Sequence, residues 1–343
     1  MASETHRRVR TLVIALGALM VVAALALGYG GRRGLFAGSA APMEKLSIAL
    51  PTTPHAALLF IAAAKGYFAQ EGLDVTVTRV SHGKAALDLL EERKVDLASA
   101  AEVPFVISVL KGARLGIAAT VVSVSTEMAL VVRRDRAIAV PHDLAGKRIG
   151  VTFGTSGEYF LWAFFIRHKL APDSVTMVDL PPGQMVKALT QGTIDAAATW
   201  EPVKSEAFVA LADNALSFIA ADAYTVTHVV IGHSEFLNAR PEAIERLVRA
   251  LLRAEEFARS EPKQALALVA DQLKLDLKVA QVGWKDLDFK VNLRQSQLVT
   301  LEDEARWAMA RGYVAKGPVP NFLPRLYLPA LLAVQPERMT VVR

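Results

Sequence analysis

Two glutamates stand at matching places in a pattern that the chain repeats. Glu102 follows Asp96 by six residues, and Glu201 follows Asp195 by the same spacing. A carboxylate at the end of a strand can accept hydrogen bonds from an amine or another N–H group of a ligand, and two carboxylates across a cleft can carry out acid–base chemistry. Each can instead be a charge at a helix N-terminus that the helix dipole stabilises. The sequence leaves both interpretations open.

The elements that must position these glutamates form the same repeat. One helical run opens at Gly83 and another at Gly183, about one hundred residues later, and each leads through a short apolar strand to one of the two glutamates. This order predicts two similar α/β lobes. Loops at the carboxyl ends of parallel strands carry free backbone groups and helix starts, so we expect a small ligand to bind between the lobes.

Hydroxyl groups and glycines follow several of the predicted strands. The first N–H groups of a helix lack intrahelical partners and carry positive dipole character, and nearby hydroxyls add donors, so this composition is typical of an anion-binding site. Helix capping is the competing explanation for any one of these residues. The candidate ligand-binding residues of this kind are Thr52, Thr53, Ser81, Gly83, Thr126, Gly154, Thr155 and Ser156.

Histidines and one tryptophan complete the candidate site. His55 and His82 fall in predicted cleft loops, and we include His228 as a further ligand contact. Trp200, next to Glu201, can stack on a ligand or simply pack in the core. No two histidines have a helical metal-ligand spacing, and no nucleotide-binding loop or nucleophile elbow is present. We therefore expect no catalytic residue, no metal ligand and no cofactor.

The division of the chain follows from strands that alternate with helices from residue 45 onward, which is typical of βαβ units and a mostly parallel sheet. Expected helices include 55–69 and, near the C-terminus, 241–259 and 297–311. A strand near 127–133 and another near 224–231 are expected to cross between lobes and act as a hinge. We predict that lobe 1 comprises residues 44–130 and 225–343, and that lobe 2 comprises residues 131–224.

The N-terminal region has the pattern of an export signal or membrane anchor. Residues 11–30 carry no charge and are long enough to cross a membrane as a helix, after three arginines. We predict a signal or anchor over 1–33 and a linker over 34–43. A retained anchor and a cleaved signal both remain open, and either places the domain outside the cytoplasm.

Composition excludes several classes of protein. The chain has no cysteine, which excludes disulfides, thiol chemistry and a lipid-modified cysteine. The net charge is +5, but residues 1–33 hold five arginines and one glutamate, so the remainder has a net charge of about +1. Nothing in this balance indicates a nucleic-acid partner.

One run of residues resembles a known family. The stretch 64–75, AKGYFAQEGLDV, is similar to the signature of solute-binding proteins for nitrate, sulfonate, taurine and thiamine-precursor ABC importers, the NMT1/THI5-like family. Further segments follow in the family's order, among them DLAGKRIGV at 143–151, GTIDA at 192–196 and WEP at 200–202. Together the matching segments cover roughly residues 45–232.

The resemblance implies a type II periplasmic binding fold, with two lobes, two hinge strands and a solute trapped between them. It also implies an ABC permease and its ATPase as partners, a monomeric receptor and a periplasmic location, with tethering through residues 11–30. The expected solute is small and anionic or zwitterionic, with nitrogen-containing groups as an open alternative. The family's enzymatic branch, which makes the thiamine pyrimidine, depends on a cysteine-rich motif that this chain lacks. A membrane-tethered sensor and a fold-related enzyme using cleft carboxylates remain alternatives.

Overall fold

The computed structural model describes residues 43–220 and 224–342. The signal or anchor predicted over 1–33, and all but the last residue of the predicted linker, lie outside these described residues. Among the helices of the described part, none has the length and apolar character needed to span a membrane.

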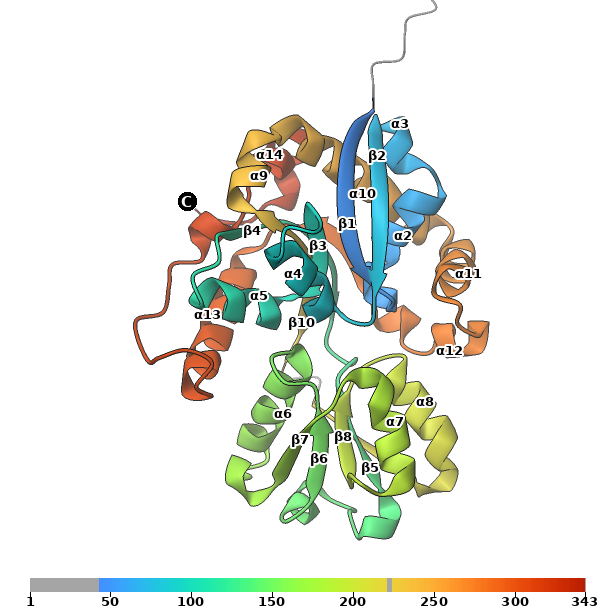
Figure 1. Cartoon of the computed structure of the whole chain (residues 1–343). Helices are drawn as coiled ribbons and strands as arrows, with labels where there is room; N and C mark the ends of the chain where they lie inside the picture. Colours follow the sequence, from blue (N-terminus) through green and yellow to red (C-terminus); the bar gives the residue numbers. More distant parts are fainter. Residues whose placement is uncertain (1–42, 221–223, 343) are drawn as a thin grey trace, which may run out of the picture. The chain divides into compact units, whose positions relative to one another are not determined.

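The first lobe is built on a six-stranded sheet with the order β11-β4-β10-β3-β1-β2 (Figure 1). Its strands are β1 (Glu44–Pro51), β2 (Leu73–Val80), β3 (Leu97–Ala101), β4 (Leu115–Val124), β10 (Val226–His233) and β11 (Asp288–Asn292). β1 runs parallel to β2 and β3, whereas β10 is antiparallel to both of its neighbours, β3 and β4. The long return strand β10 therefore lies inside the sheet and, like the edge strand β11, which is antiparallel to β4, runs opposite to the other four strands.

The second lobe repeats this plan in a five-stranded sheet with the order β7-β6-β8-β5-β9. Its strands are β5 (Ala129–Arg133), β6 (Arg148–Val151), β7 (Thr176–Asp179), β8 (Ala196–Thr199) and β9 (Ala215–Ile219). β6 is parallel to β7 and β8, and β5 is the antiparallel strand between β8 and β9. The expected α/β fold with two similar lobes is confirmed.

The repeated aspartates perform the same backbone task in both lobes. Asp96 precedes β3 and its Oδ2 accepts a hydrogen bond of 2.8 Å from the Ser47 N–H of β1. Asp195 precedes β8 and its Oδ2 accepts one of 2.9 Å from the Arg148 N–H of β6. Each side chain thus joins the start of its own strand to the start of the neighbouring strand. The spacing noticed in the sequence reflects this structural duplication.

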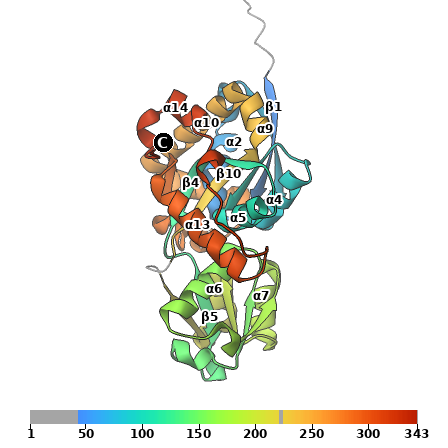
Figure 2. The ribbon, with the colours of Figure 1, turned by 90° about the vertical axis from the view of Figure 1, so that its left-hand side faces the viewer.

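Helices cover both faces of each sheet (Figures 1 and 2). In the first lobe they are α2 (Ala57–Ala64), α3 (Tyr67–Gln70), α4 (Gly83–Glu91), α5 (Glu102–Leu110), α9 (Ser234–Ala239), α10 (Pro241–Ser260), α11 (Pro262–Leu273), α12 (Leu277–Gln281), α13 (Gln295–Ala310) and α14 (Pro329–Val334). The second lobe contains α6 (Ser156–Arg167), α7 (Pro182–Gln191) and α8 (Val203–Leu211).

One expected helix is divided. The helix predicted over 55–69 is a 3-10 turn, Pro54–Ala56, followed by α2 and then by α3. Gly66 separates α2 from α3 because it has a φ of 68°, a left-handed conformation that ends a helix and that glycine adopts without a steric penalty. The first six residues of α2 are buried, in agreement with its apolar sequence.

Two connections join the lobes. The chain passes from β4 to β5 between Val124 and Ala129, and it returns from β9 to β10 between Ile219 and Val226. Packing also joins the lobes, because one buried apolar cluster includes Val103 of α5, Phe160 of α6 and Trp307 of α13. The lobe boundaries predicted from the sequence, near residues 130 and 224, are close to the two crossings. The exact boundaries stay a prediction.

Candidate functional site

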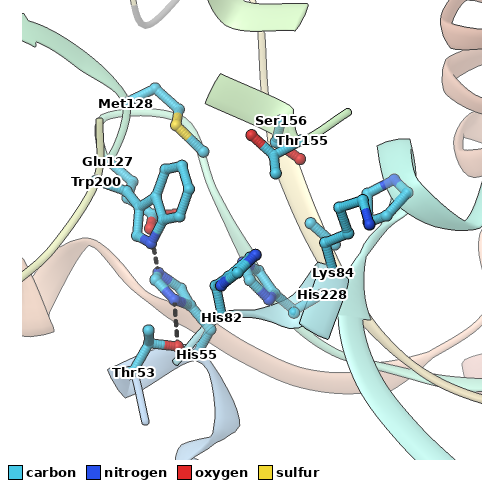
Figure 3. Close-up of a pocket in the computed structure, with 13 residues that line it drawn as sticks. Thr53, His55, His82, Lys84, Glu127, Met128, Thr155, Ser156, Trp200 and His228 are labelled. Carbon is cyan, nitrogen blue, oxygen red and sulfur yellow. Dashed lines mark hydrogen bonds and ion pairs between the residues drawn. The ribbon is translucent and has the colours of Figure 1, made fainter. Parts of the chain in front are cut away.

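A pocket with an empty volume of about 390 Å³, including the part open to solvent, lies where the two lobes meet the first crossing. Both lobes line it (Figure 3). His55 and Thr53 come from the turn after β1, and Thr155 and Ser156 come from the start of α6 across the pocket. Its position between two α/β lobes is the one expected for a small-molecule site.

The floor of the pocket consists of buried polar side chains in contact with one another. His55 Nε2 lies 2.5 Å from Glu127 Oε1, and His55 Nδ1 lies 3.0 Å from the Thr53 hydroxyl. The ring of His228, on β10, stacks on the His55 ring at a centroid distance of 4.1 Å. Burial, and then the neighbouring His55, lower the pKa of His228 well below its usual value. These residues form a buried polar surface under the pocket.

Two helix N-termini face the pocket, those of α4 and α6. Gly83 begins α4, and an added Cβ there would lie 2.8 Å from the Ala100 Cα, so only glycine allows the helix to start this close to β3. At α6, a Cβ on Gly157 would lie 3.0 Å from Trp200, which packs against the helix start. The free N–H groups and positive dipole ends of the two helices favour an anionic group in the pocket.

Two further polar side chains, Lys84 and His82, lie at the rim of the pocket. Lys84 lies in the first turn of α4, where its ammonium group pairs with Asp88 at 2.9 Å. His82 precedes the same helix and its Nδ1 lies 2.8 Å from the Ser81 hydroxyl. Burial, and then Lys84, lower the pKa of His82. At neutral pH His82 is therefore a neutral hydrogen-bonding group and Lys84 supplies the positive charge.

Glu102 lies beneath the pocket and does not line it. It is fully buried at the start of α5, and its Oε2 accepts a 2.8 Å hydrogen bond from the Thr227 N–H of β10. Burial raises its pKa to about 8, although the bond from Thr227 opposes that shift. The nearby Glu304 of α13 accepts a hydrogen bond from the Tyr224 hydroxyl, and burial followed by the charge of Glu102 raises the Glu304 pKa well above its usual value.

Glu201 also lies outside the lining of the main pocket. Its Oε1 is 3.0 Å from the Lys204 ammonium group, and its Oε2 accepts a hydrogen bond from the Ser205 N–H in the first turn of α8. Together with Thr126 it borders a separate hollow of about 300 Å³. Direct ligand contacts by Glu102 and Glu201 therefore stay predictions from the sequence.

The other predicted site residues divide into two groups. Eight of them line the pocket: Thr53, His55, His82, Gly83, Thr155, Ser156, Trp200 and His228. Thr52, Ser81 and Gly154 are not among its lining residues. The Thr52 hydroxyl instead donates to the Val80 carbonyl, and the Gly154 N–H donates to Glu158.

Sequence reasoning missed two charged residues of the pocket. Lys84 directly follows Gly83, so its place in the first turn of a cleft-facing helix was available as a signal. Glu127 lies in the first crossing between β4 and β5 and is 5% exposed. Its signal was weaker: a single carboxylate between two apolar strands, with no partner nearby in the sequence.

Comparison with known proteins gives relatives whose alignments span between 39% and 72% of this chain. A Brucella abortus protein named as a binding protein is 32% identical over 140 residues, and the alignment spans 39% of this chain and only 43% of that relative. A Bacillus subtilis protein named for binding aliphatic sulfonates is 24% identical and covers 72% of this chain and 75% of its own length. The Saccharomyces cerevisiae pyrimidine phosphate synthase THI13 is 23% identical, over 67% of this chain and 72% of its own.

Solved structures agree with the fold. The periplasmic aliphatic sulphonate binding protein SsuA from Escherichia coli matches with a TM-score of 0.72 and 18% identity, over 83% of this chain and 98% of that one. Residues 53–265, more than half of the chain, match the family described as NMT1/THI5 like. The chain therefore belongs to the NMT1/THI5-like family, and its two lobes have the α/β fold of periplasmic binding proteins.

Proposed function

We propose that the protein is the extracytoplasmic solute-binding receptor of an ABC importer, which captures a small polar organic solute between its lobes and delivers it to a permease. The observation that carries this proposal is the pocket at the junction of the two lobes, to which both lobes and the first crossing contribute residues. Such a placement couples solute binding to the angle between the lobes.

The chemistry of the pocket favours a solute with an anionic group. The starts of α4 and α6 supply N–H donors, Ser156 supplies a hydroxyl, and Lys84 supplies a positive charge. Trp200 offers an apolar wall for a short carbon chain. We therefore propose small organosulfonates and zwitterions such as taurine as the first class to test, which agrees with the names of the Bacillus and Escherichia proteins.

Hydrogen bonds from the region after α13 hold the two lobes together in the arrangement described here. Arg311 and Tyr313 follow α13 and both donate to the carboxylate of Glu158 in α6, with 3.0 Å between Arg311 Nη2 and Glu158 Oε1. Glu158 is 2% exposed in this arrangement, so separating the lobes would break these hydrogen bonds and expose the carboxylate to solvent. Contacts of a bound solute with both lobes would further stabilise this arrangement.

A receptor is a better proposal than an enzyme for this chain. The yeast relative is a synthase, but the enzymatic branch depends on a cysteine-rich motif and this chain has no cysteine. A membrane-tethered sensor would use the same pocket and differs only in its partner. We propose a periplasmic location, a monomer, and contact with a permease and its ATPase.

The test is direct titration of the purified protein with alkanesulfonates, taurine and nitrate by calorimetry, together with mass spectrometry of any solute that copurifies. We expect one solute per chain, and about ten-fold weaker binding in Lys84→Gln because a charged hydrogen-bonding group is lost. Lys94→Gln is the matched control, since Lys94 pairs with Glu92 on the surface. Steady conversion of a solute into a product, or equal binding in Lys84→Gln and the unaltered protein, would contradict the proposal.

A further inference from the structure

Three metal-ligating side chains meet in the floor of the pocket. His55 follows β1, Glu127 lies in the first crossing, and His228 lies in β10 just after the second crossing. Each offers one ligand atom, and these atoms all lie within 4.8 Å of one another. Among residues 43–220 and 224–342, no other three His, Asp or Glu side chains come close enough to hold one metal ion. All three members of this group are buried.

Hydrogen bonds inside the group leave coordination capacity unused. The Oε2 atom of Glu127 and the Nδ1 atom of His228 are buried and have no hydrogen-bond partner in the described structure. Leaving a buried polar atom without a partner is energetically unfavourable. A cation between the two imidazoles and the carboxylate would satisfy these atoms and neutralise the charge of Glu127.

A hydrogen bond orients the His55 ring, and the stacked His228 ring, 8° from parallel, would have to tilt for both rings to direct a nitrogen at one ion. The Nδ1 atom of His55 is 3.0 Å from the Thr53 hydroxyl, so its Nε2 atom is the one that faces Glu127. A hydrogen bond to the second ring nitrogen is the usual way in which a ligating histidine is held in place. With metal–ligand bonds of about 2.0–2.2 Å, tetrahedral ligand atoms lie roughly 3.2–3.5 Å apart. The 2.5 Å between His55 Nε2 and Glu127 Oε1 would therefore widen by roughly 1 Å on binding.

The donor set selects the kind of ion. Two imidazole nitrogens and one carboxylate suit Zn²⁺, Co²⁺, Ni²⁺ or Fe²⁺, whereas Mg²⁺ and Ca²⁺ prefer sites made of oxygen atoms. Three protein ligands leave at least one coordination position open. The same three residues line the solute pocket, so that position is directed at the space between the lobes.

We propose that His55, Glu127 and His228 bind one divalent transition-metal ion, with an open coordination position facing the pocket. The ion connects a loop of the first lobe to segments beside both crossings, so it stiffens the hinge. It also provides a binding point for an anionic or nitrogen donor group of the solute, and this second part rests on the receptor function proposed above.

The test begins with the metal alone. Tag-free protein is stripped with a chelator and titrated with Zn²⁺ by calorimetry, and with Co²⁺ by visible absorption, without any solute. We expect one ion per chain, an absorption band of Co²⁺ in a site of low coordination number, and a higher melting temperature with metal than without. Absence of stoichiometric binding by the unaltered protein would overturn the proposal, whatever its solute affinity.

Substitutions assign the ligands. Glu127→Gln and His228→Gln should each weaken Zn²⁺ binding by about 100-fold or more, because a three-ligand site loses one ligand. His142→Gln, on the exposed surface, should retain it. Melting curves of the metal-free variants report folding separately. Equal Zn²⁺ affinity in Glu127→Gln, His228→Gln and the control would contradict the assignment.

The solute then tests the second part. Sulfonate or taurine titrations are repeated with metal-free and Zn²⁺-loaded protein, and we expect at least ten-fold tighter solute binding in the loaded form. Stoichiometric Zn²⁺ binding with unchanged solute affinity would overturn the role of the open position and leave the receptor function intact. Solute binding without any Zn²⁺ binding would support the receptor and reject the metal site.

Discussion

The two lobes share one strand order, but they neutralise their equivalent glutamates in different ways. In the second lobe Glu201 pairs with Lys204 at 3.0 Å. In the first lobe Glu102 has no ion pair within the described structure; it accepts a hydrogen bond from the Thr227 N–H, and burial raises its pKa to about 8. One lobe therefore uses a cation to balance the buried carboxylate, and the other uses a proton.

The two repeats share the backbone contacts of their aspartates but differ in the surroundings of their glutamates. Asp96 and Asp195 keep the same backbone partners because the strand pairing of each lobe depends on them. The side chains that follow the strands are free to diverge, since they serve packing and binding. An equal spacing in the sequence thus indicates equal structure, while the chemistry at each position depends on neighbours from distant segments.

The largest expected effect is an opposite response of the two glutamates to neutralisation. At pH 8.5 Glu201→Gln should lower the free energy of unfolding by about 1–3 kcal/mol, because Lys204, only 14% exposed, loses its charged partner. Glu102→Gln should raise the free energy of unfolding at the same pH, because it removes a buried negative charge. Urea denaturation followed by circular dichroism measures both.

The pH dependence of stability tests independently whether the charge of Glu102 destabilises the folded protein. The folded-state pKa of Glu102, about 8, is above its unfolded value, so the folded protein binds a proton that the unfolded chain releases. The free energy of unfolding should fall by up to about 1.4 kcal/mol per pH unit between roughly pH 4.5 and 8. Glu102→Gln should flatten this slope, and Glu304 accounts for the slope that remains, since burial and the Glu102 charge raise its pKa as well. A slope unchanged in Glu102→Gln would contradict the proton-based account.

Solute affinity sharpens the same comparison. A direct contact between either glutamate and the solute, as predicted from the sequence, requires a loss of about ten-fold or more on substitution by Gln. Neither side chain lines the main pocket, so the geometry predicts a smaller change. Calorimetric titration of both variants decides between the two predictions.

The glycines that open the repeated helices form the next matched pair. Gly83→Ala should lower the free energy of unfolding by about 1–3 kcal/mol, because the added Cβ would lie 2.8 Å from backbone atom Cα of Ala100. Gly183→Ala meets no atom within 4 Å and should be neutral or stabilising by up to about 1 kcal/mol through helix propensity. Thermal and urea denaturation measure both changes.

Binding provides a second readout for this pair. α4 faces the pocket through Gly83 and Lys84, so Gly83→Ala should also weaken solute binding, whereas Gly183→Ala should not. Equal effects of the two substitutions on stability and on binding would show that the repeats do not differ at these positions.

Much of the fold could be predicted because its signals are local. The apolar run at 73–80 coincides with β2, and the amphipathic segment at 241–259 differs from α10 by one residue. β9 and β11 were not predicted, since each is only five residues long and lies partly exposed at a sheet edge, so its few apolar residues give a weak signal. α14 follows a proline-rich stretch that hides its single apolar turn.

The site was less predictable because its contacts are not local. His55 was recognised as a pocket residue from its place after a strand, but its partners Glu127, in the first crossing, and His228, in β10, are far away in the sequence. Spacing rules for metal ligands apply to one helix or one loop, so they could not detect this group. The surroundings of Glu102 could not be predicted for the same reason: the N–H that donates to it belongs to Thr227, and its contact with a ligand stays a prediction.

The smallest expected effect concerns two threonines that follow equivalent strands. The Thr52 hydroxyl donates to the Val80 carbonyl at 3.2 Å, and the Thr152 hydroxyl donates to the Leu180 carbonyl at 2.7 Å. Substitution by Val should cost about 0.5–1.5 kcal/mol of stability at each position, with the larger loss at Thr152, which is only 7% exposed. Because neither residue lines the pocket, both variants should bind solute as the unaltered protein does. A ten-fold loss of affinity in Thr52→Val alone would restore Thr52 as a ligand contact and show that the repeats diverge at this position too.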